Sequence, residues 1–371
     1  MEPQLAASSE ESLIRASVRG FLESRRRPER LRFESPPGAS FDDGIWQGLA
    51  ELGLLGLRLP EDCGGSGLGP RCAAAVAEEA GRVLLPEPLI SCALVPGAVV
   101  AGLAPSAGRN EVIGGLTDGA IRTVLCWQTR PGQLAPANGL RLSSNDLLSG
   151  DAAFVSHWGA ARWLLVLAWR GDHPVLATVE TSSATIARRT RRLGDGGRSG
   201  FLTFANTPVE HVLAEGPAAL SAVTDGLDEG ALYAAAFLAG LGRGVLDRIL
   251  EHLRTRTQFG RPLGTFQTLQ HQAVDMHLAL RLTEATVRRA ARSLEMRRGP
   301  EATLSVSAAK ARAASSATWV CRSAIQMFGG LGFAEEADLG VALRVAHQYA
   351  SAFGARAAHL RRFGHLSACA A

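Results

Sequence analysis

A polar segment between two stretches with a helical apolar pattern constrains the fold more than any other feature. It spans residues 254–272, with the sequence RTRTQFGRPLGTFQTLQHQ. The apolar residues before and after it are Phe237, Leu241, Val245, Ile249 and Leu253, then Val274, Leu278 and Leu282. A recurrence of about four residues is typical of helices buried along one face. The Gly-Arg-Pro sequence at 260–262 is expected to end the first helix. The sequence therefore predicts two long helices joined by a charged hairpin tip.

This hairpin resembles the acyl-CoA dehydrogenase family, whose members carry Arg-x-x-Phe-Gly, then Phe-Gln and an amide-rich helix. The matching residues are Arg256, Gln258, Phe259, Gly260, Phe266 and Gln267. The resemblance implies that the tip crosses a dimer interface and contacts the pyrophosphate of an FAD bound mainly to the neighbouring subunit. Guanidinium groups suit this role because they pair bidentately with phosphate oxygens. The cofactor-binding residues that it implies here are Arg256, Gln258, Phe259, Leu263 and Phe266. A solvated hairpin turn is the alternative interpretation.

A second motif of the family, Gln-x-x-Gly-Gly, matches Gln326, Gly329 and Gly330 in IQMFGGLGF. In the family this segment also lies at the dimer interface, with its backbone near the diphosphate or adenosine of FAD. Glycine suits that place because a main chain without Cβ can approach a ligand closely and adopt positive φ. A simple helix end is the alternative. The motif follows the hairpin at about the family's interval, which favours the binding site.

Composition limits the number of domains, the cellular compartment and the classes of partner that we expect for this chain. Its 371 residues, 46% hydrophobic and 20% charged, are enough for two or three packed units. Six cysteines without a Cys-x-x-Cys pair or a His-rich cluster argue for a cytoplasmic protein and against a metal site. The net charge is +4, but 38 of the 39 basic residues are arginine, in runs without interleaved aromatics, so we expect no nucleic-acid partner. No signal peptide or bilayer-spanning apolar stretch is evident, so we expect no membrane association.

Local patterns divide the chain into helical, β and helical regions. Helices are expected over 8–32, 46–59 and 71–85, and again from about 216. Short β-favouring runs separated by Gly, Asn, Asp and Ser occur at 124–127, 154–155, 163–169, 175–179 and 201–204. The resemblance implies an α+β architecture: an N-terminal helical domain (1–119), a middle β-barrel domain (120–215) and a C-terminal four-helix bundle (216–371). It also implies assembly as a dimer of dimers.

The β region carries only part of the family's own flavin site. The segment FVSHWG resembles a Trp-Ile-Thr-like segment beside the flavin ring, with Phe154 in the aromatic place and Ser156 keeping a hydroxyl near the flavin. A buried aromatic beside a turn serine is the alternative. The family's Thr-Glu-Pro-x-Ala-Gly-Ser-Asp loop is missing, because the corresponding run reads CWQTRPGQLAPANG. The chain's own flavin site is therefore incomplete by sequence.

A catalytic base is also missing from the expected positions. Acyl-CoA dehydrogenation needs a carboxylate near the acidic α-proton, while a β-hydride passes to the flavin. The family places its glutamate at one of two positions, which correspond here to Phe353 and Gly230. Glu229 is the neighbouring carboxylate, but one step along a helix turns a side chain by about 100°, which makes it a poor substitute.

The retained residues are those that family members donate to a partner's FAD, whereas the lost ones serve the chain's own site. This pattern resembles one subunit of the heteromeric acyl-CoA dehydrogenases of bacterial steroid side-chain degradation. We therefore expect a heterotetramer in which a second family subunit supplies the base and most of the acyl-CoA pocket. The alternatives are a self-sufficient homo-oligomeric flavoenzyme of altered chemistry, such as a biosynthetic oxidation or oxygenation, a homomeric dehydrogenase with Glu229 or an unidentified base, and a flavin-free scaffold.

Overall fold

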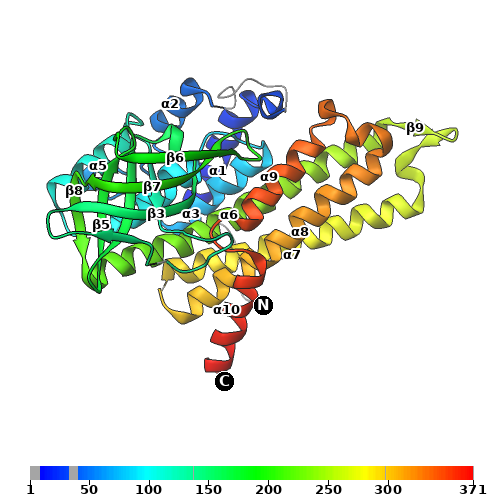
Figure 1. Ribbon diagram of the computed structural model, residues 1–371. Coiled ribbons are helices and arrows are strands. Elements are labelled where there is room, and N and C mark those ends of the chain that lie inside the picture. Colours follow the sequence, from blue (N-terminus) through cyan, green and yellow to red (C-terminus); the bar gives the residue numbers. More distant parts are fainter. Residues whose placement is uncertain (1–8, 33–40, 137, 297, 371) are drawn as a thin grey trace.

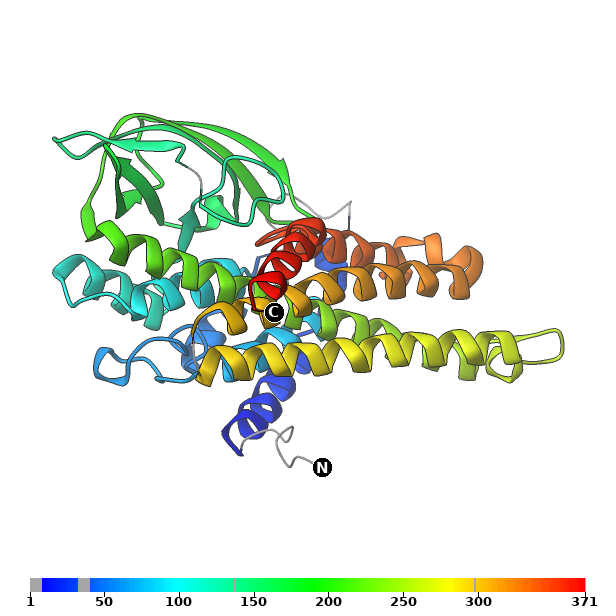
Figure 2. The same ribbon diagram turned by 90° about the horizontal axis from the view of Figure 1, so that it is seen from below.

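A helix of 40 residues, α6 (Gly216–Thr255), runs through the molecule and touches each of its parts (Figure 1). The structure is a computed structural model that describes residues 9–32, 41–136, 138–296 and 298–370. Helices precede and follow a β region, and α6 begins directly after the last strand of that region. The first half of α6 supports the β region and the N-terminal helices, and the second half belongs to a helical bundle (Figure 2).

The N-terminal part is helical and packs on α6 through glycine-lined contacts. Its elements are α1 (Ser9–Ser24), η2 (Pro28–Leu31), α2 (Asp43–Glu51), η3 (Glu61–Cys63), α3 (Pro70–Arg82), the π-helical turn η4 (Ile90–Leu94), α4 (Val95–Ala101) and α5 (Ala107–Thr117). A Cβ added at Gly81 of α3 would overlap the carbonyl oxygen of Phe237, and one added at Gly240 of α6 would overlap that of Glu78. These two glycines let the backbones of α3 and α6 come into direct contact.

The helix expected over 46–59 is shorter in the structure. It begins after Asp42, whose side chain accepts a hydrogen bond from the Ile45 N–H, and it ends at Glu51. Gly53 follows with a φ of 71°, which ends the helical path. The leucines beyond Gly53 are still buried, but they lie in turns. The apolar run that predicted a longer helix therefore reflects burial in the core and not helical structure.

The middle region is an eight-stranded curved sheet in the order β6-β7-β3-β2-β4-β5-β8, with β1 on β4 (Figure 2). The strands are β1 (Thr123–Cys126), β2 (Leu140–Leu142), β3 (Leu147–Ser156), β4 (Trp163–Arg170), β5 (His173–Glu180), β6 (Ile186–Arg192), β7 (Arg198–Pro208) and β8 (His211–Glu215). Most neighbours are antiparallel, whereas β1 and β2 run parallel to β4. Among the described pairings the outer strands β6 and β8 do not meet, so the barrel is open.

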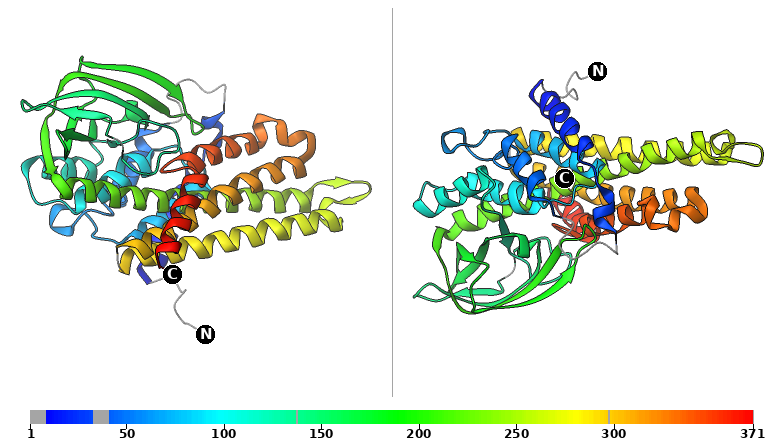
Figure 3. Two further views of the ribbon diagram at one scale, coloured as in Figure 1. Left: turned by 60° about the horizontal axis from the view of Figure 1, so that its bottom comes forward. Right: turned by 90° about the horizontal axis from the view of Figure 1, so that it is seen from above.

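The C-terminal part is a bundle of α6, α7 (Gln267–Met296), α8 (Pro300–Phe328) and α9 (Leu339–Ser351), with α10 (Arg356–Ala370) packed against α8. The bundle projects away from the β region, and the α6–α7 hairpin lies at its free end (Figure 3). Of the helices in the described ranges, none combines the length and hydropathy that a membrane crossing requires.

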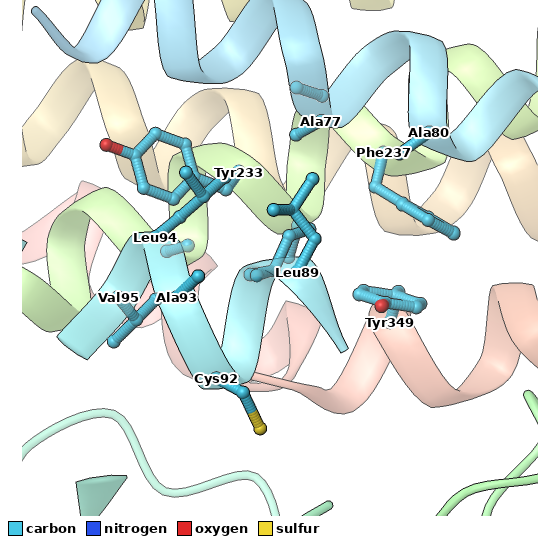
Figure 4. Packing of buried hydrophobic residues seen from close by; sticks show 14 of the residues in the cluster. Ala77, Ala80, Leu89, Cys92, Ala93, Leu94, Val95, Tyr233, Phe237 and Tyr349 are labelled. Atoms are coloured by element: carbon cyan, nitrogen blue, oxygen red, sulfur yellow. The ribbon is translucent and has the colours of Figure 1, made fainter. Parts of the chain in front are cut away.

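A cluster of buried hydrophobic side chains lies where α3, η4, α6 and α9 meet (Figure 4). Phe237 of α6 stacks on Tyr349 of α9, with ring centroids 4.0 Å apart and planes 18° apart. Leu89 and Leu94 belong to the same cluster, and each is at most 2% exposed. This core fixes α9 and η4 relative to α6, and both elements line the cavity described below.

Candidate cofactor-binding site

The hairpin tip is a small antiparallel ribbon between the two long helices. Helix α6 ends at Thr255, five residues before the Gly-Arg-Pro sequence that was expected to end it, because Arg256 takes an extended conformation with ψ of 121°. The strands β9 (Thr257–Gln258) and β10 (Arg261–Pro262) then pair, with Gln258 opposite Arg261. The Leu263 N–H donates to the Arg256 carbonyl at 2.8 Å, which closes the base of the ribbon before η6 (Leu263–Thr265).

Among the predicted side chains of the tip, Arg256, Gln258 and Phe259 are exposed, whereas Leu263 and Phe266 are half-buried. Phe259 is 89% exposed and has a φ of 53°, a strained conformation for an aromatic residue. It meets the edge of Phe266, and the Arg261 guanidinium lies 4.1 Å from the Phe266 ring centre. Arg256 is exposed and makes no hydrogen bond through its side chain with the described part of the chain. Its charge is therefore available to an external anion.

The Gly-Gly segment lies at the same end of the bundle as the hairpin (Figure 1). Helix α8 ends at Phe328, and Gly329 follows with a φ of 64°, which favours glycine. A Cβ added at Gly329 or Gly330 would have no atom within 4 Å, so both positions face open space. Gln326 is exposed one turn earlier.

A ring stack ties the two motifs together. His252, near the end of α6, lies 4.0 Å from the Phe328 ring at an interplanar angle of 15°. Burial and the nearby Arg256 charge both lower the pKa of His252. The lowered pKa favours the neutral imidazole, so His252 adds no positive charge beside Arg256. The stack therefore holds the arginine tip and the Gly-Gly turn at one place, although 70 residues of sequence separate them.

A separate cavity of about 60 Å³, partly open to solvent, lies between the β region and the helices. Phe154 and Ser156 of β3 line it, as the resemblance implied for the flavin-facing segment. The other lining residues are Ile90, Ser91, Val95, Val124, Leu125, Trp127, Gln128, His157, Gln348, Tyr349, Ala352 and Phe353. Phe154 has a φ of 56° and packs edge-on against Phe201. The cavity has mostly apolar walls and a few hydroxyl, amide and imidazole groups.

The two family base positions meet at one point beside this cavity. A Cβ added at Gly230 of α6 would lie 2.7 Å from the Phe353 ring and 3.0 Å from Val95. The Phe353 ring thus fills the space that a side chain at 230 would need. Both positions lack a carboxylate, and the occupant of one depends on the glycine at the other.

Buried polar side chains form hydrogen bonds with the backbone of the turn that carries Phe353. Phe353 has a φ of 53° and Gly354 a φ of 102°. Lys310, the only lysine of the chain, is fully buried and donates to the carbonyls of Ala350 at 2.9 Å and Gly354 at 3.1 Å. Burial lowers the pKa of Lys310 to about 7. His359 Nε2 lies 2.9 Å from the Phe353 carbonyl oxygen. These contacts fix the ring over Gly230.

Glu229 is fully buried and points into an ion-pair network. Its carboxylate accepts two hydrogen bonds from Arg58, at 2.7 and 2.9 Å, and further ones from Tyr233 and Arg298. Burial would raise the pKa of Glu229, but the Arg58 hydrogen bonds and charges outweigh it and lower the pKa below its ordinary value. A carboxylate held ionised by three donors is a weak proton acceptor.

A hydrogen-bonded chain of four side chains crosses the cavity wall. Ser91 Oγ lies 2.8 Å from His157 Nδ1, and His157 Nε2 lies 3.0 Å from Asp195 Oδ2. Gln348 donates to the same Asp195 oxygen at 2.6 Å, and the Gly197 N–H donates to the other at 3.0 Å. Burial would raise the pKa of Asp195, but His157 and these donors lower it. No sequence motif predicts this group, because its members come from four distant segments and no regular spacing relates them.

Helices before and after a curved sheet, with an exposed arginine and open glycines at the end of a helical bundle, are the arrangement expected of a flavin-dependent acyl-CoA dehydrogenase. The model "Acyl-CoA dehydrogenase, N-terminal domain" matches residues 8–118, and "Acyl-CoA dehydrogenase, C-terminal domain" matches residues 220–365. The chain belongs to the acyl-CoA dehydrogenase family, whose members are FAD-dependent oxidoreductases acting on acyl-CoA. The family and the three-part architecture expected from the sequence are confirmed.

Several relatives match over nearly the whole chain. The acyl-CoA dehydrogenase IpdE2 of Mycolicibacterium smegmatis is 27% identical over 96% of this chain and 98% of its own. The mitochondrial isovaleryl-CoA dehydrogenase of Arabidopsis thaliana is 27% identical over 94% of this chain and 88% of its own. A variant of the Tcur3481–Tcur3483 steroid ACAD is 28% identical, with a TM-score of 0.85 over 97% of this chain and 98% of that one. The ChsE4–ChsE5 complex of Mycobacterium tuberculosis, 20% identical with a TM-score of 0.86 over 99% of both chains, shares the fold.

The bundle end fits an FAD diphosphate better than the chain's own cavity fits a working flavin site. The tip offers an exposed arginine without an internal partner and backbone with room for a close ligand. The residues there that would hold the group are Arg256, Gln258, Phe259, Leu263, Phe266, Gln326, Gly329 and Gly330. In the described part of the chain no cluster of three or more His, Cys, Asp or Glu side chains could hold a metal ion.

Proposed function

We propose that this chain is one subunit of a heteromeric acyl-CoA dehydrogenase, and that it donates its bundle end to an FAD held mainly by a second subunit of the same family. The catalytic glutamate then belongs to that second subunit. One observation carries the proposal: neither Phe353 nor Gly230, the two positions where the family keeps its base, carries a carboxylate, and the Phe353 ring fills the space that a side chain at 230 would need. Arg256, the guanidinium offered to a partner's cofactor, is meanwhile exposed and makes no side-chain hydrogen bond with the described residues.

The part that this chain would take in catalysis is binding and orientation. Bound FAD supplies a hydride acceptor for α,β-dehydrogenation of an acyl-CoA thioester. Arg256 would pair with the diphosphate through two parallel hydrogen bonds. The open backbone at Gly329 and Gly330 would let main-chain groups approach it. Phe259 and Phe266 would shield the site from water, because both rings already pack together at the tip.

The substrate and assembly follow the relatives. The Tcur3481–Tcur3483 enzyme is a steroid ACAD, and ChsE4–ChsE5 is a complex of two different chains. We extend both features to this protein: an acyl-CoA with a steroid side chain as substrate, and a heterotetramer as the assembly. A cytoplasmic location fits the free thiols of five described cysteines, Cys63, Cys72, Cys92, Cys126 and Cys321.

The test is to measure flavin content and mass for the chain alone and after co-expression with each family subunit encoded beside it. We expect a colourless or poorly stable single chain, and a yellow heterotetramer with about one FAD per unlike pair. A homo-oligomer with one FAD per subunit would refute the proposal and favour a self-sufficient flavoenzyme, in which Ser156 would contact the flavin. A chain that stays colourless with every partner would also refute it and would favour a flavin-free scaffold.

A further inference from the structure

The side chains of Ser91, His157 and Asp195 are hydrogen-bonded in the order of groups found in serine hydrolases. A hydroxyl contacts an imidazole at 2.8 Å, and the other ring nitrogen contacts a carboxylate at 3.0 Å. The ring is turned relative to the usual arrangement, since Nδ1 faces the serine and Nε2 the aspartate. Either nitrogen of a neutral imidazole can accept a proton while the other donates one.

Asp195 fixes the tautomer of His157. Its ionised carboxylate accepts hydrogen bonds from His157, Gln348 and Gly197, so the His157 proton stands on Nε2. Nδ1 is left as the acceptor for the Ser91 hydroxyl proton. Asp195 and His157 are 2% and 5% exposed, so water competes little with either contact. A buried carboxylate would also stabilise the imidazolium formed when Nδ1 takes a proton.

The Ser91–His157–Asp195 group, called the relay below, borders the cavity beside which the two family base positions lie. Ser91, His157 and Gln348 all line it, and His157 is the only imidazole or carboxylate residue among the described lining residues. Ile90, Val95 and Val124 offer an apolar wall for an acyl chain. The Ser156 hydroxyl lines the same space and makes no side-chain hydrogen bond with the described residues, so it is available to a ligand oxygen.

We propose that Ser91 is a nucleophile, with His157 as its general base and Asp195 as a positioning residue, and that this cavity hydrolyses small acyl thioesters or esters. Ser91 Oγ bonds to the carbonyl carbon while its proton passes to His157 Nδ1. The carbon–sulfur bond then breaks, and the leaving thiolate takes that proton. Water attacks the acyl-serine ester, His157 accepts and returns a proton, and a carboxylic acid and free Ser91 result. The activity is separate from the proposed dehydrogenation.

The experiment uses the full chain and a small alkyl fluorophosphonate, which replaces its P–F bond with a bond to an activated serine oxygen. We expect Ser91 to be labelled at least 100-fold faster than the exposed Ser182, as read from peptide masses within one sample. Ser91→Ala should abolish that label, and His157→Gln should slow it by about 100-fold. The surface change Ser182→Ala is the matched control and should leave Ser91 labelling unchanged.

The comparison of Ser91 with Ser182 needs only the wild-type chain, so a variant that fails to fold does not affect it. Equal labelling rates at the two serines would overturn the proposal and leave the relay as a tie between the N-terminal, β and C-terminal regions. Fast labelling that persists in a folded His157→Gln variant would overturn the role of His157 as the base. A phenolate burst from p-nitrophenyl acetate, matching the labelled fraction, is the expected second result.

Discussion

Replacing Arg256 by alanine isolates the contribution of the hairpin tip to cofactor binding. In the structure the guanidinium is exposed and makes no hydrogen bond with the described chain, so the fold loses no contact. The free energy of unfolding should therefore change by less than about 0.5 kcal/mol. A charge-assisted hydrogen bond contributes about 1.5–3 kcal/mol. Because 1.4 kcal/mol corresponds to a factor of ten, the dissociation constant of FAD from the complex should rise about 10- to 150-fold.

The assay is a fluorescence titration of FAD into the flavin-free complex, with urea unfolding of each variant in parallel. Arg289→Ala is the matched control, since Arg289 is also exposed but lies 22 residues beyond the start of α7, roughly 33 Å along the helix. His252 gives a second readout: losing the Arg256 charge should raise the pKa of His252. If the Arg256 variant binds FAD as tightly as the control, the donation of this tip to a partner's cofactor is refuted.

Three further changes test the buried groups. Gly230→Ala should cost about 1–3 kcal/mol of stability in urea unfolding, because the new Cβ meets the Phe353 ring, and a second change, Phe353→Ala, should relieve that loss. Glu229→Gln should cost about 3–5 kcal/mol at neutral pH by breaking the pair with Arg58. The lowered pKa of Glu229 makes its contribution complete above the ordinary value of about 4.3, so the gap to wild type should close only below about pH 4. The pKa of Lys310 is about 7 in the folded protein, so between pH 7 and 10 the unfolded chain binds more protons than the folded one. The free energy of unfolding of the wild type should therefore rise with pH over this range. Its slope should exceed that of Lys310→Met by up to about 1.4 kcal/mol per pH unit. Parallel slopes would contradict the buried amine.

The long elements were readable from the sequence because their patterns are local. The stripe from Phe237 to Leu253 has the helical period over several turns, and that stretch lies within α6. Strands β4 and β5 likewise contain the β-branched and aromatic runs expected for them. The Arg-x-x-Phe-Gly and Gln-x-x-Gly-Gly motifs led to the right family, because each is short, contiguous and in the expected order.

Features that depend on contacts between distant segments could not be predicted. Strand β6 (Ile186–Arg192) is not among the expected β runs, because its arginine-rich sequence buries only Ile186 and is held in the sheet by backbone pairing with β7. The leucine run up to 59 predicted a helix, although turns bury it equally well. The relay from Ser91 to Asp195 joins residues 104 positions apart, which no spacing rule covers.

The buried position of Lys310 also sets what can be attached to this protein. With the only lysine side chain fully enclosed and the other basic residues all arginine, no exposed ε-amine is left for acetylation, ubiquitin transfer or amine-directed cross-linkers. In a complex with a lysine-bearing partner, such reagents would mark the partner and, on this chain, little besides the α-amino group. The same partner could thus be tethered or tagged selectively without modifying the hairpin tip that is proposed to contact the cofactor.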